Sequence, residues 1–358
     1  MNSNSHSNTV SFKGKELIVG IDISKKSWRF ALRNSGLFIE EKSIDPEPEV
    51  LYKYLDRNYP DAAYKAVYEA SYCGFWIQRE LEDLGIECIV VHPADIPTKH
   101  KEKEQKTDPL DARKLARELE KGDLEPIYVP DERAQEIRSV ARLVSTFTKE
   151  MTRIKNRINS HLDFYGVRVP GTYSRWSVDF ILWLEHEAFD PDNPAATVLF
   201  DLIDTFKYHK QKRKDLIKEA IRLCKDYFGA DRVKNLLTIN GIGKRTMLTI
   251  LTELIDLERF DNDFFKICRF VGLTPSMSRS GGKDYRPERI TKRGNKEIMH
   301  KLIEASWAAL RSDKGMLLDY NDLISRMSKQ DAIVRIAKKL LRRFCCIWRE
   351  NRPYEPVI

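Results

Sequence analysis

Residues 16–24, ELIVGIDIS, form a run of aliphatic residues that contains the carboxylate Asp22. Such a run predicts a buried β-strand, and further β-rich stretches at 27–34 and 38–44 predict an antiparallel meander. A charged side chain inside an apolar strand is costly unless it is paired or bound to a metal ion. The stretch therefore predicts the start of a sheet with a functional carboxylate, although a solvent-facing aspartate on an edge strand would give the same pattern.

Helical and strand patterns alternate after the meander. Their expected ranges are a helix at 48–58, a strand within 62–70, a helix at 75–85, a strand at 86–92, a helix at 109–122 and a short strand at 125–130. Three meandering strands followed by alternating helices and strands predict an α/β fold. The order also suits the RNase H-like arrangement.

The rest of the chain is helical in pattern. Apolar residues spaced by three and four predict a long helix at 133–164, which must pack against a partner helix or a second chain. A basic helix is expected at 207–229, and a third, mainly helical unit from about 233. The length of 358 residues suits two or three domains of about 150 residues each.

Composition limits the class of protein. With 42% hydrophobic and 32% charged residues, the chain is not collagen-like, disulfide-dense or largely disordered. It has 62 Lys and Arg against 54 Asp and Glu, and the net charge of +8 hints at an acidic partner such as nucleic acid but fits an ordinary basic enzyme equally well. Six cysteines without C-x-x-C spacing predict reduced thiols in a cytoplasmic protein. No apolar run is long enough to predict a membrane span, and residues 1–15 are expected to form a disordered tail.

Three more carboxylates accompany Asp22. Glu69 ends the expected strand AVYEA, and Asp108 and Asp111 begin the helix in KTDPLDARKLA. Helix capping alone would explain both aspartates, because Asp108 suits the N-cap and Asp111 the third helical position. Their spacing also places both on one helix face, where with Asp22 they could bind Mg²⁺ and assist phosphodiester chemistry.

The C-terminal part carries two features typical of nucleic-acid binding. Gly241, Gly243 and Lys244 lie in INGIGK, which resembles a helix-hairpin-helix turn but also fits a plain helix-to-helix turn. Residues 276–301 contain eight basic and three acidic residues, an excess of 8 − 3 = +5. The basic positions proposed to contact nucleic acid there are Arg279, Lys283, Arg286, Lys292 and Arg293. The Ser-Gly-Gly at 280–282, taken alone, is typical of a linker.

Together these pieces resemble one family, the DEDD transposases of the insertion-sequence-110 type, which are bridge-RNA-guided recombinases. The matching motifs cover nearly the whole chain. They are VGIDISKKSW, YEAS and KTDPLDARKLA in the first part and GIGKRTMLTILTEL, RFVGLTP, SGG and ITKRGNKEIMHKLIEAS in the last.

The resemblance implies roles for individual residues. Asp22, Glu69, Asp108 and Asp111 would form the metal-binding tetrad of a RuvC-like domain, holding Mg²⁺ or Mn²⁺. A serine in the C-terminal domain would attack a DNA phosphate, and Ser280 is the first choice, with Ser278 and Ser276 as alternatives. The resemblance also implies composite active sites in a homodimer or homotetramer, and a non-coding bridge RNA that pairs with donor and target DNA.

The expected organisation has four parts: a tail at 1–15, a RuvC-like DEDD domain at 16–130, a helical coiled-coil and dimerisation segment at 131–230, and a C-terminal transposase domain at 231–358. The expected fold is thus an α/β RNase H-like domain, a long helical segment and a mainly α-helical domain. The leading hypothesis is a Mg²⁺-assisted serine recombinase acting on DNA at the prokaryotic nucleoid. A RuvC-like structure-specific endonuclease without strand transfer is the alternative, and a non-catalytic nucleic-acid-binding protein is a third hypothesis.

Overall fold

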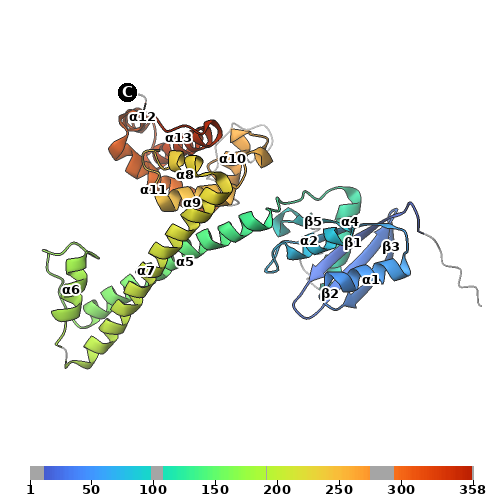
Figure 1. The fold of residues 1–358 in the computed structure, drawn as a ribbon, viewed down its shortest axis with the longest axis horizontal. Helices are drawn as coiled ribbons and strands as arrows, with labels where there is room; N and C mark the ends of the chain where they lie inside the picture. Colours follow the sequence, from blue (N-terminus) through green and yellow to red (C-terminus); the bar gives the residue numbers. More distant parts are fainter. Residues whose placement is uncertain (1–11, 98–107, 191, 275–293, 357–358) are drawn as a thin grey trace, which may run out of the picture. The chain divides into compact units, whose positions relative to one another are not determined.

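The computed structural model describes residues 12–97, 108–190, 192–274 and 294–356. The chain divides into two compact units, Met1–Val129 and Pro130–Ile358 (Figure 1). The tail at 1–11 lies outside the described residues, whereas Phe12 packs edge-on against Tyr59 with ring centroids 5.1 Å apart. The expected helical segment and C-terminal domain both fall in the second unit, and their separation at residue 230 stays a prediction.

A five-stranded mixed sheet forms the centre of the first unit, in the order β3-β2-β1-β4-β5. The strands are β1 (Glu16–Ile23), β2 (Trp28–Asn34), β3 (Leu37–Ile44), β4 (Ala63–Glu69) and β5 (Glu87–Val91). The antiparallel β1–β2–β3 meander is confirmed, and β4 and β5 are parallel to β1. This mixed sheet with flanking helices is consistent with the RNase H-like expectation.

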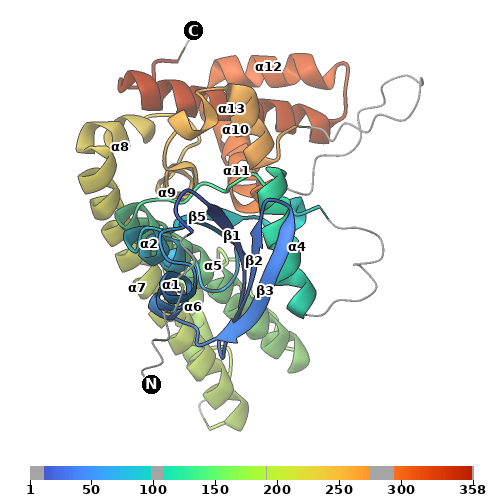
Figure 2. The same ribbon diagram turned by 90° about the vertical axis from the view of Figure 1, so that its right-hand side faces the viewer.

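Helices cover both faces of this sheet (Figure 2). On one face lie α1 (Pro48–Asn58) and α2 (Trp76–Asp83), whose Leu51 and Ile77 join the core beneath β1. On the other lies α4 (Asp108–Lys121), which packs Ala112 and Ala116 over the strands. Ile18 and Val67, from β1 and β4, face α4 in the same core. The alternating direction of strand side chains thus assigns each strand residue to one of two helical layers.

The expected strand at 125–130 is wrong. Only an isolated bridge forms there, between Val91 and Pro126. Pro126 and Pro130 carry no backbone N–H group, so the segment cannot continue a regular ladder of hydrogen bonds.

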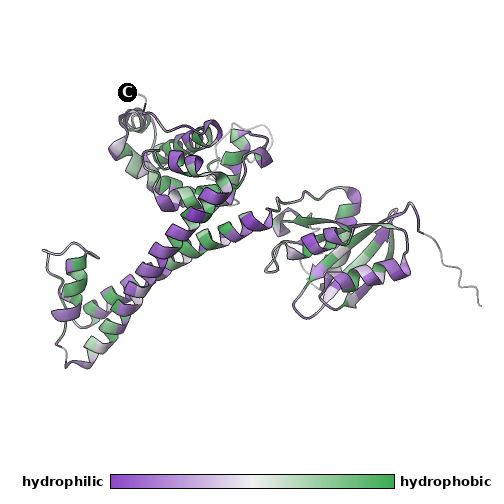
Figure 3. Ribbon diagram, in the orientation of Figure 1, coloured by the Kyte–Doolittle hydropathy of each residue, from purple (hydrophilic) through white to green (hydrophobic). Residues whose placement is uncertain are grey.

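The second unit is built on two long antiparallel helices, α5 (Glu132–Phe164) and α7 (Pro194–Phe228). Tyr227 at the end of α7 donates a hydrogen bond to Asp131 at the start of α5, and a ring nitrogen of His161 lies 2.9 Å from the carbonyl oxygen of Ala195 at the opposite end. Polar and apolar residues alternate along both helices (Figure 3). The partner that the long helix requires is therefore α7 of the same chain, and a coiled coil between chains stays a prediction.

Shorter helices complete this unit. They are α6 (Val178–His186), α8 (Ala230–Leu236), α9 (Lys244–Leu254), α10 (Phe264–Val271), α11 (Lys296–Ser312), α12 (Lys314–Ile324) and α13 (Lys329–Glu350). Short 3₁₀ turns occur at Pro93–Asp95 and Glu258–Phe260. Four of the six cysteines are buried, and all six are free thiols. In the described part of the chain, no helix is long and apolar enough to cross a membrane.

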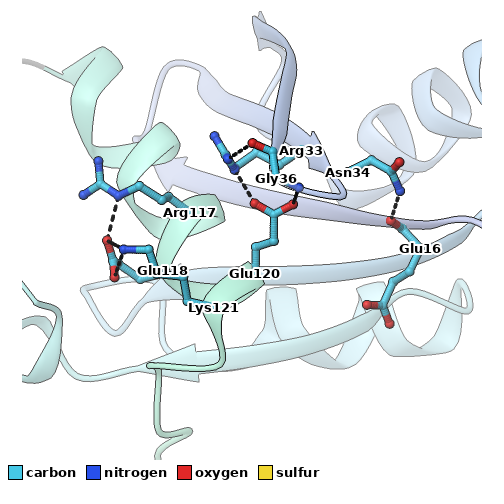
Figure 4. A network of polar contacts seen from close by, with 8 residues as sticks. All are labelled: Glu16, Arg33, Asn34, Gly36, Arg117, Glu118, Glu120 and Lys121. Carbon is cyan, nitrogen blue, oxygen red and sulfur yellow. Dashed lines mark hydrogen bonds and ion pairs between the residues drawn. The ribbon is translucent and has the colours of Figure 1, made fainter.

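A network of polar contacts joins the C-terminal end of α4 to the β2–β3 hairpin (Figure 4). Glu120 accepts hydrogen bonds from Arg33 Nε and from the backbone N–H of Gly36, both at 2.6 Å. Burial acts to raise the pKa of the Glu120 carboxyl, but these two hydrogen bonds and the charge of Arg33 outweigh it and lower the pKa. Ionised Glu120 therefore fixes one end of α4 to the sheet.

This network predicts an acid-sensitive first unit. Because the pKa of Glu120 is lower in the folded protein, its stabilising effect is present above the ordinary value of 4.5 and is lost as pH falls through the lowered value. We expect Glu120→Gln to reduce the unfolding free energy at neutral pH by about 1–2 kcal/mol and to flatten its decline in acid. Urea unfolding, together with hydrogen exchange of the backbone amides of β2, measures the unfolding free energy at each pH. Glu49→Gln is the control, because Glu49 makes only an exposed pair with Lys53, and an equal effect there would contradict the prediction.

Candidate active site

Parallel pairing of β1 and β4 brings Asp22 and Glu69 to neighbouring positions. The register pairs Ile21 with Tyr68, and the next residues along the two strands are Asp22 and Glu69. Asp22 shares its face of β1 with Ile18, and Glu69 shares its face of β4 with Val67. Neighbouring strands lie about 4.8 Å apart, so both half-buried carboxylates lie close together on the α4 face, at the carboxyl ends of their strands.

Helix α4 crosses β1 closely because residue 20 is a glycine. A Cβ atom built on Gly20 would lie 2.1 Å from the carbonyl oxygen of Ala112 and 2.4 Å from the amide nitrogen of Ala116. Real side chains do not approach backbone so closely, so only glycine permits this crossing of β1 and α4. Half-buried Asp111 directly precedes Ala112. The sequence therefore positions the start of α4 over the strand, two residues before Asp22.

Asp108 begins α4, but its side chain lies outside what the structure describes. Of the four predicted carboxylates, the fold thus brings Asp22 and Glu69 together on the face of the sheet that α4 covers, and Asp111 belongs to that helix. Within 12–97 and the other described ranges, no group of three or more His, Cys, Asp or Glu side chains forms a ready metal site. The donors are all carboxylate oxygens, the ligand type preferred by Mg²⁺ and Mn²⁺, so their chemistry fits a hard divalent cation.

Positive side chains lie beside these carboxylates, a feature that the sequence analysis missed. Arg29 of β2 stands directly opposite Asp22 in the antiparallel register. Its guanidinium is 3.1 Å from Glu41, which also pairs with Arg113 of α4. The Glu41 side chain is only 10% exposed, so the pairing links β3, β2 and α4 at the site. The alternation of side chains along the expected strand at 27–34 could have placed Arg29 on one face of the sheet. Its partner Glu41, however, lies twelve residues further along the chain, on the next strand.

Gly241 has a structural reason for being glycine. Its φ angle is +86°, and a Cβ atom there would lie 2.4 Å from the carbonyl oxygen of Ala305 in α11. Gly243 and Lys244 are exposed at the start of α9, where Gly243 precedes the helix without a capping side chain. The predicted turn thus packs one glycine against α11 and leaves the next two predicted residues accessible to a ligand.

The predicted serine loop lies outside the described residues. This applies to Ser276, Ser278, Ser280, Arg279, Lys283, Arg286, Lys292 and Arg293. The described residues that flank this loop lie close together. A Cβ atom built on Gly294 would lie 2.2 Å from the Cα atom of Gly272. The amide of Asn295 also donates a 2.8 Å hydrogen bond to the carbonyl of Phe270. The described residues on the two sides of 275–293 therefore lie close together, at the end of α10 and the start of α11.

This junction is tied to α5. Asn295 caps α11 by accepting hydrogen bonds from the amides of Glu297 and Ile298. Its side-chain amide donates to Glu253 of α9 at 3.2 Å, and Arg142 of α5 makes two hydrogen bonds, of 2.7 and 3.0 Å, to the same carboxylate. The start of α11 is thus linked through Glu253 of α9 to α5 within the second unit.

Two family models match the chain. Residues 19–167 match a DEDD model of the IS110 type, described as Transposase, and residues 233–321 match one described as Transposase IS116/IS110/IS902 family. The first match includes Asp22, Glu69, Asp108 and Asp111, and the second includes Gly241 and Ser280.

Curated relatives extend over most of the chain. A Sinorhizobium fredii protein whose name describes it as transposase y4qE is 27% identical over 300 residues, covering 82% of this chain and 72% of the relative. A second protein of that organism, y4rJ, also named as a transposase, is 28% identical over 302 residues, or 77% and 74% of the two chains. The transposase for insertion sequence element IS1533 of Leptospira borgpetersenii is 22% identical over 349 residues, covering 95% of this chain and 97% of its own.

Proposed function

Because the chain belongs to the insertion-sequence-110 family of transposases, which cut and rejoin DNA, we propose that its first unit supplies a metal-binding carboxylate site for that reaction. The observation that carries this proposal is the neighbouring placement of Asp22 and Glu69 on the face covered by α4. Asp108 and Asp111 belong to the first turn of this helix and would complete the tetrad.

The four carboxylates would hold Mg²⁺ or Mn²⁺. When bound, such ions neutralise charge that develops on a phosphodiester and position the attacking and leaving oxygens. The protein's own part is to hold negatively charged oxygens on three rigid elements, β1, β4 and α4. Arg29 and Arg113, both paired with Glu41, add positive charge that favours the approach of a DNA phosphate.

Ser280 is the proposed nucleophile, with Ser278 and Ser276 as alternatives. In the proposed step its Oγ forms a bond to phosphorus while the bond from phosphorus to one deoxyribose oxygen breaks. The hydroxyl proton leaves the serine, and the departing deoxyribose oxygen takes up a proton. The product is a covalent serine–DNA phosphodiester, whose energy the subsequent joining step reuses. A free serine hydroxyl is a weak nucleophile, so this proposal requires the metal site nearby in the active assembly.

We also propose that DNA and a non-coding bridge RNA are the partners, and that the chain acts as a homodimer or homotetramer. The eight basic residues within 276–301 and exposed Lys244 support contact with phosphates. Exposed apolar side chains at the end of α5, in α6 and in the first turns of α7, including Phe164, Val178 and Val198, support burial against another copy. Base pairing of the RNA, rather than side-chain contacts, would then select the DNA sequence.

A denaturing gel tests the serine step. With end-labelled DNA from the element's own junction, the bridge RNA and Mg²⁺, the protein is expected to form a protein-linked DNA band. Ser280→Ala should remove this band while leaving DNA binding intact, with Ser278→Ala and Ser276→Ala as matched variants. Free nicked DNA from the unaltered protein, with no linked band, would instead support a structure-specific endonuclease and contradict the serine mechanism.

A further inference from the structure

Two large aromatic side chains are exposed directly after Glu69. Tyr72 is 61% exposed and Trp76 is 42% exposed, and both lie in or just after the connection from β4 to α2. Burial of an aromatic side chain is strongly favourable, so exposed aromatics beside a candidate active site indicate a surface available to a ligand.

The connection that carries Tyr72 is anchored at both ends. The hydroxyl of buried Tyr68 donates a 3.1 Å hydrogen bond to the carbonyl of Gly74, and the amide of Gly74 donates to the carbonyl of Ser71 at 3.3 Å. Trp76 packs against buried Trp28 with ring centroids 6.3 Å apart. These contacts fix the backbone on either side of Tyr72, so its exposed ring is displayed from an ordered support.

Tyr72 also lies within electrostatic range of the carboxylate site. The pKa of its hydroxyl is raised, first by partial burial and then by the negative charges of Cys73 and Asp22. The ammonium of Lys25, from the β1–β2 turn that follows Asp22, lies 5.5 Å from the centre of the Tyr72 ring. Among the described residues Lys25 makes no salt bridge, which leaves its charge available for an anion.

We propose that Tyr72 is a stacking platform for an unpaired nucleobase of the DNA strand whose phosphate reaches Asp22 and Glu69, with Lys25 contacting a neighbouring phosphate. An aromatic face beside a free cation matches the alternation of bases and phosphates in a single strand. A base inside a duplex already has both faces stacked, so the platform selects an unpaired or unstacked nucleotide. This inference rests on the proposed metal site, because that site supplies the phosphate position.

The test uses the full-length protein in EDTA, so that binding is measured without cleavage. The probe is a short DNA duplex carrying one unpaired 2-aminopurine nucleotide, whose fluorescence falls when it stacks on an aromatic ring. We expect quenching with the unaltered protein and with Tyr72→Phe, and loss of quenching with Tyr72→Ala. We also expect the affinity of Tyr72→Ala for this probe to fall about 5- to 150-fold, the range for one lost base–aromatic stack.

Tyr208→Ala is the matched control. Tyr208 is 56% exposed and has the ammonium of Lys212 at 5.7 Å from its ring centre, but it lies on α7 of the second unit, which carries none of the four proposed carboxylates. The proposal is overturned if Tyr72→Ala quenches as the unaltered protein does, or if Tyr208→Ala loses as much affinity. A failure of the proposed metal site would give a different result, namely unchanged cleavage by an Asp22 variant. The fluorescence test of stacking requires no metal, so the two failures can be told apart.

Discussion

Replacing Asp22 with asparagine is expected to abolish metal-dependent DNA cleavage while DNA binding persists. Asparagine keeps the size of the side chain but removes the negative charge that a divalent cation requires. Metal ions contribute several kcal/mol to stabilising charge on a reacting phosphate, and about 4 kcal/mol corresponds to a thousandfold change in rate. Single-turnover cleavage of junction DNA, over a range of Mg²⁺ and Mn²⁺ concentrations, measures the loss.

The matched control is Glu16→Gln. Glu16 begins the same strand and lies on the same face as Asp22, but six residues of strand separate the two by about 20 Å. The change in charge is therefore identical and only the position differs. Cleavage by Asp22→Asn at the unaltered rate would remove the carboxylate site from the mechanism, and equal loss in Glu16→Gln would indicate a nonspecific effect of charge.

Gly20→Ala is expected to have the second large effect, through packing. The added methyl group would meet the carbonyl of Ala112 at 2.1 Å and the amide of Ala116 at 2.4 Å. Both atoms are backbone, so no side chain on α4 can move aside, and the helix itself must shift. Overpacking of this kind costs about 3 kcal/mol, which lowers the unfolding temperature of the first unit by about 10 °C or more. Because α4 carries Asp111, cleavage should fall as well.

Thermal unfolding and cleavage below the melting temperature separate the two effects. Gly171→Ala serves as the control, because a Cβ atom there meets nothing within 4 Å. If Gly20→Ala unfolded and cleaved as the unaltered protein does, the close crossing of β1 and α4 would not be what positions the carboxylates. Loss of cleavage with only a small loss of stability would show that the helix shift acts through the site.

Local sequence patterns predicted most of the elements because their signals lie within single segments. The helix expected at 48–58 and the antiparallel meander are both confirmed. The predictions were wrong where packing against another part of the same chain decides whether a segment is helical. Helix α7 begins at Pro194, well before the expected 207, and α6 was not predicted at all. Their apolar residues Phe180, Leu199 and Ile203 are helical because they share one core with α5.

The sequence by itself determined which residues are proposed to carry the chemistry: an aspartate in an apolar strand, a glutamate at a strand end and two aspartates at a helix start. Only the tertiary structure decided how they meet. The parallel β1–β4 register sets Asp22 beside Glu69, and the missing side chain of Gly20 admits the close approach of α4, the helix that bears Asp111. The pairing of Glu41 with Arg29 and Arg113, and the exposed ring of Tyr72 near Asp22, likewise depend on contacts between segments distant in sequence. Local patterns cannot encode such contacts, because they form only when the sheet and helices pack.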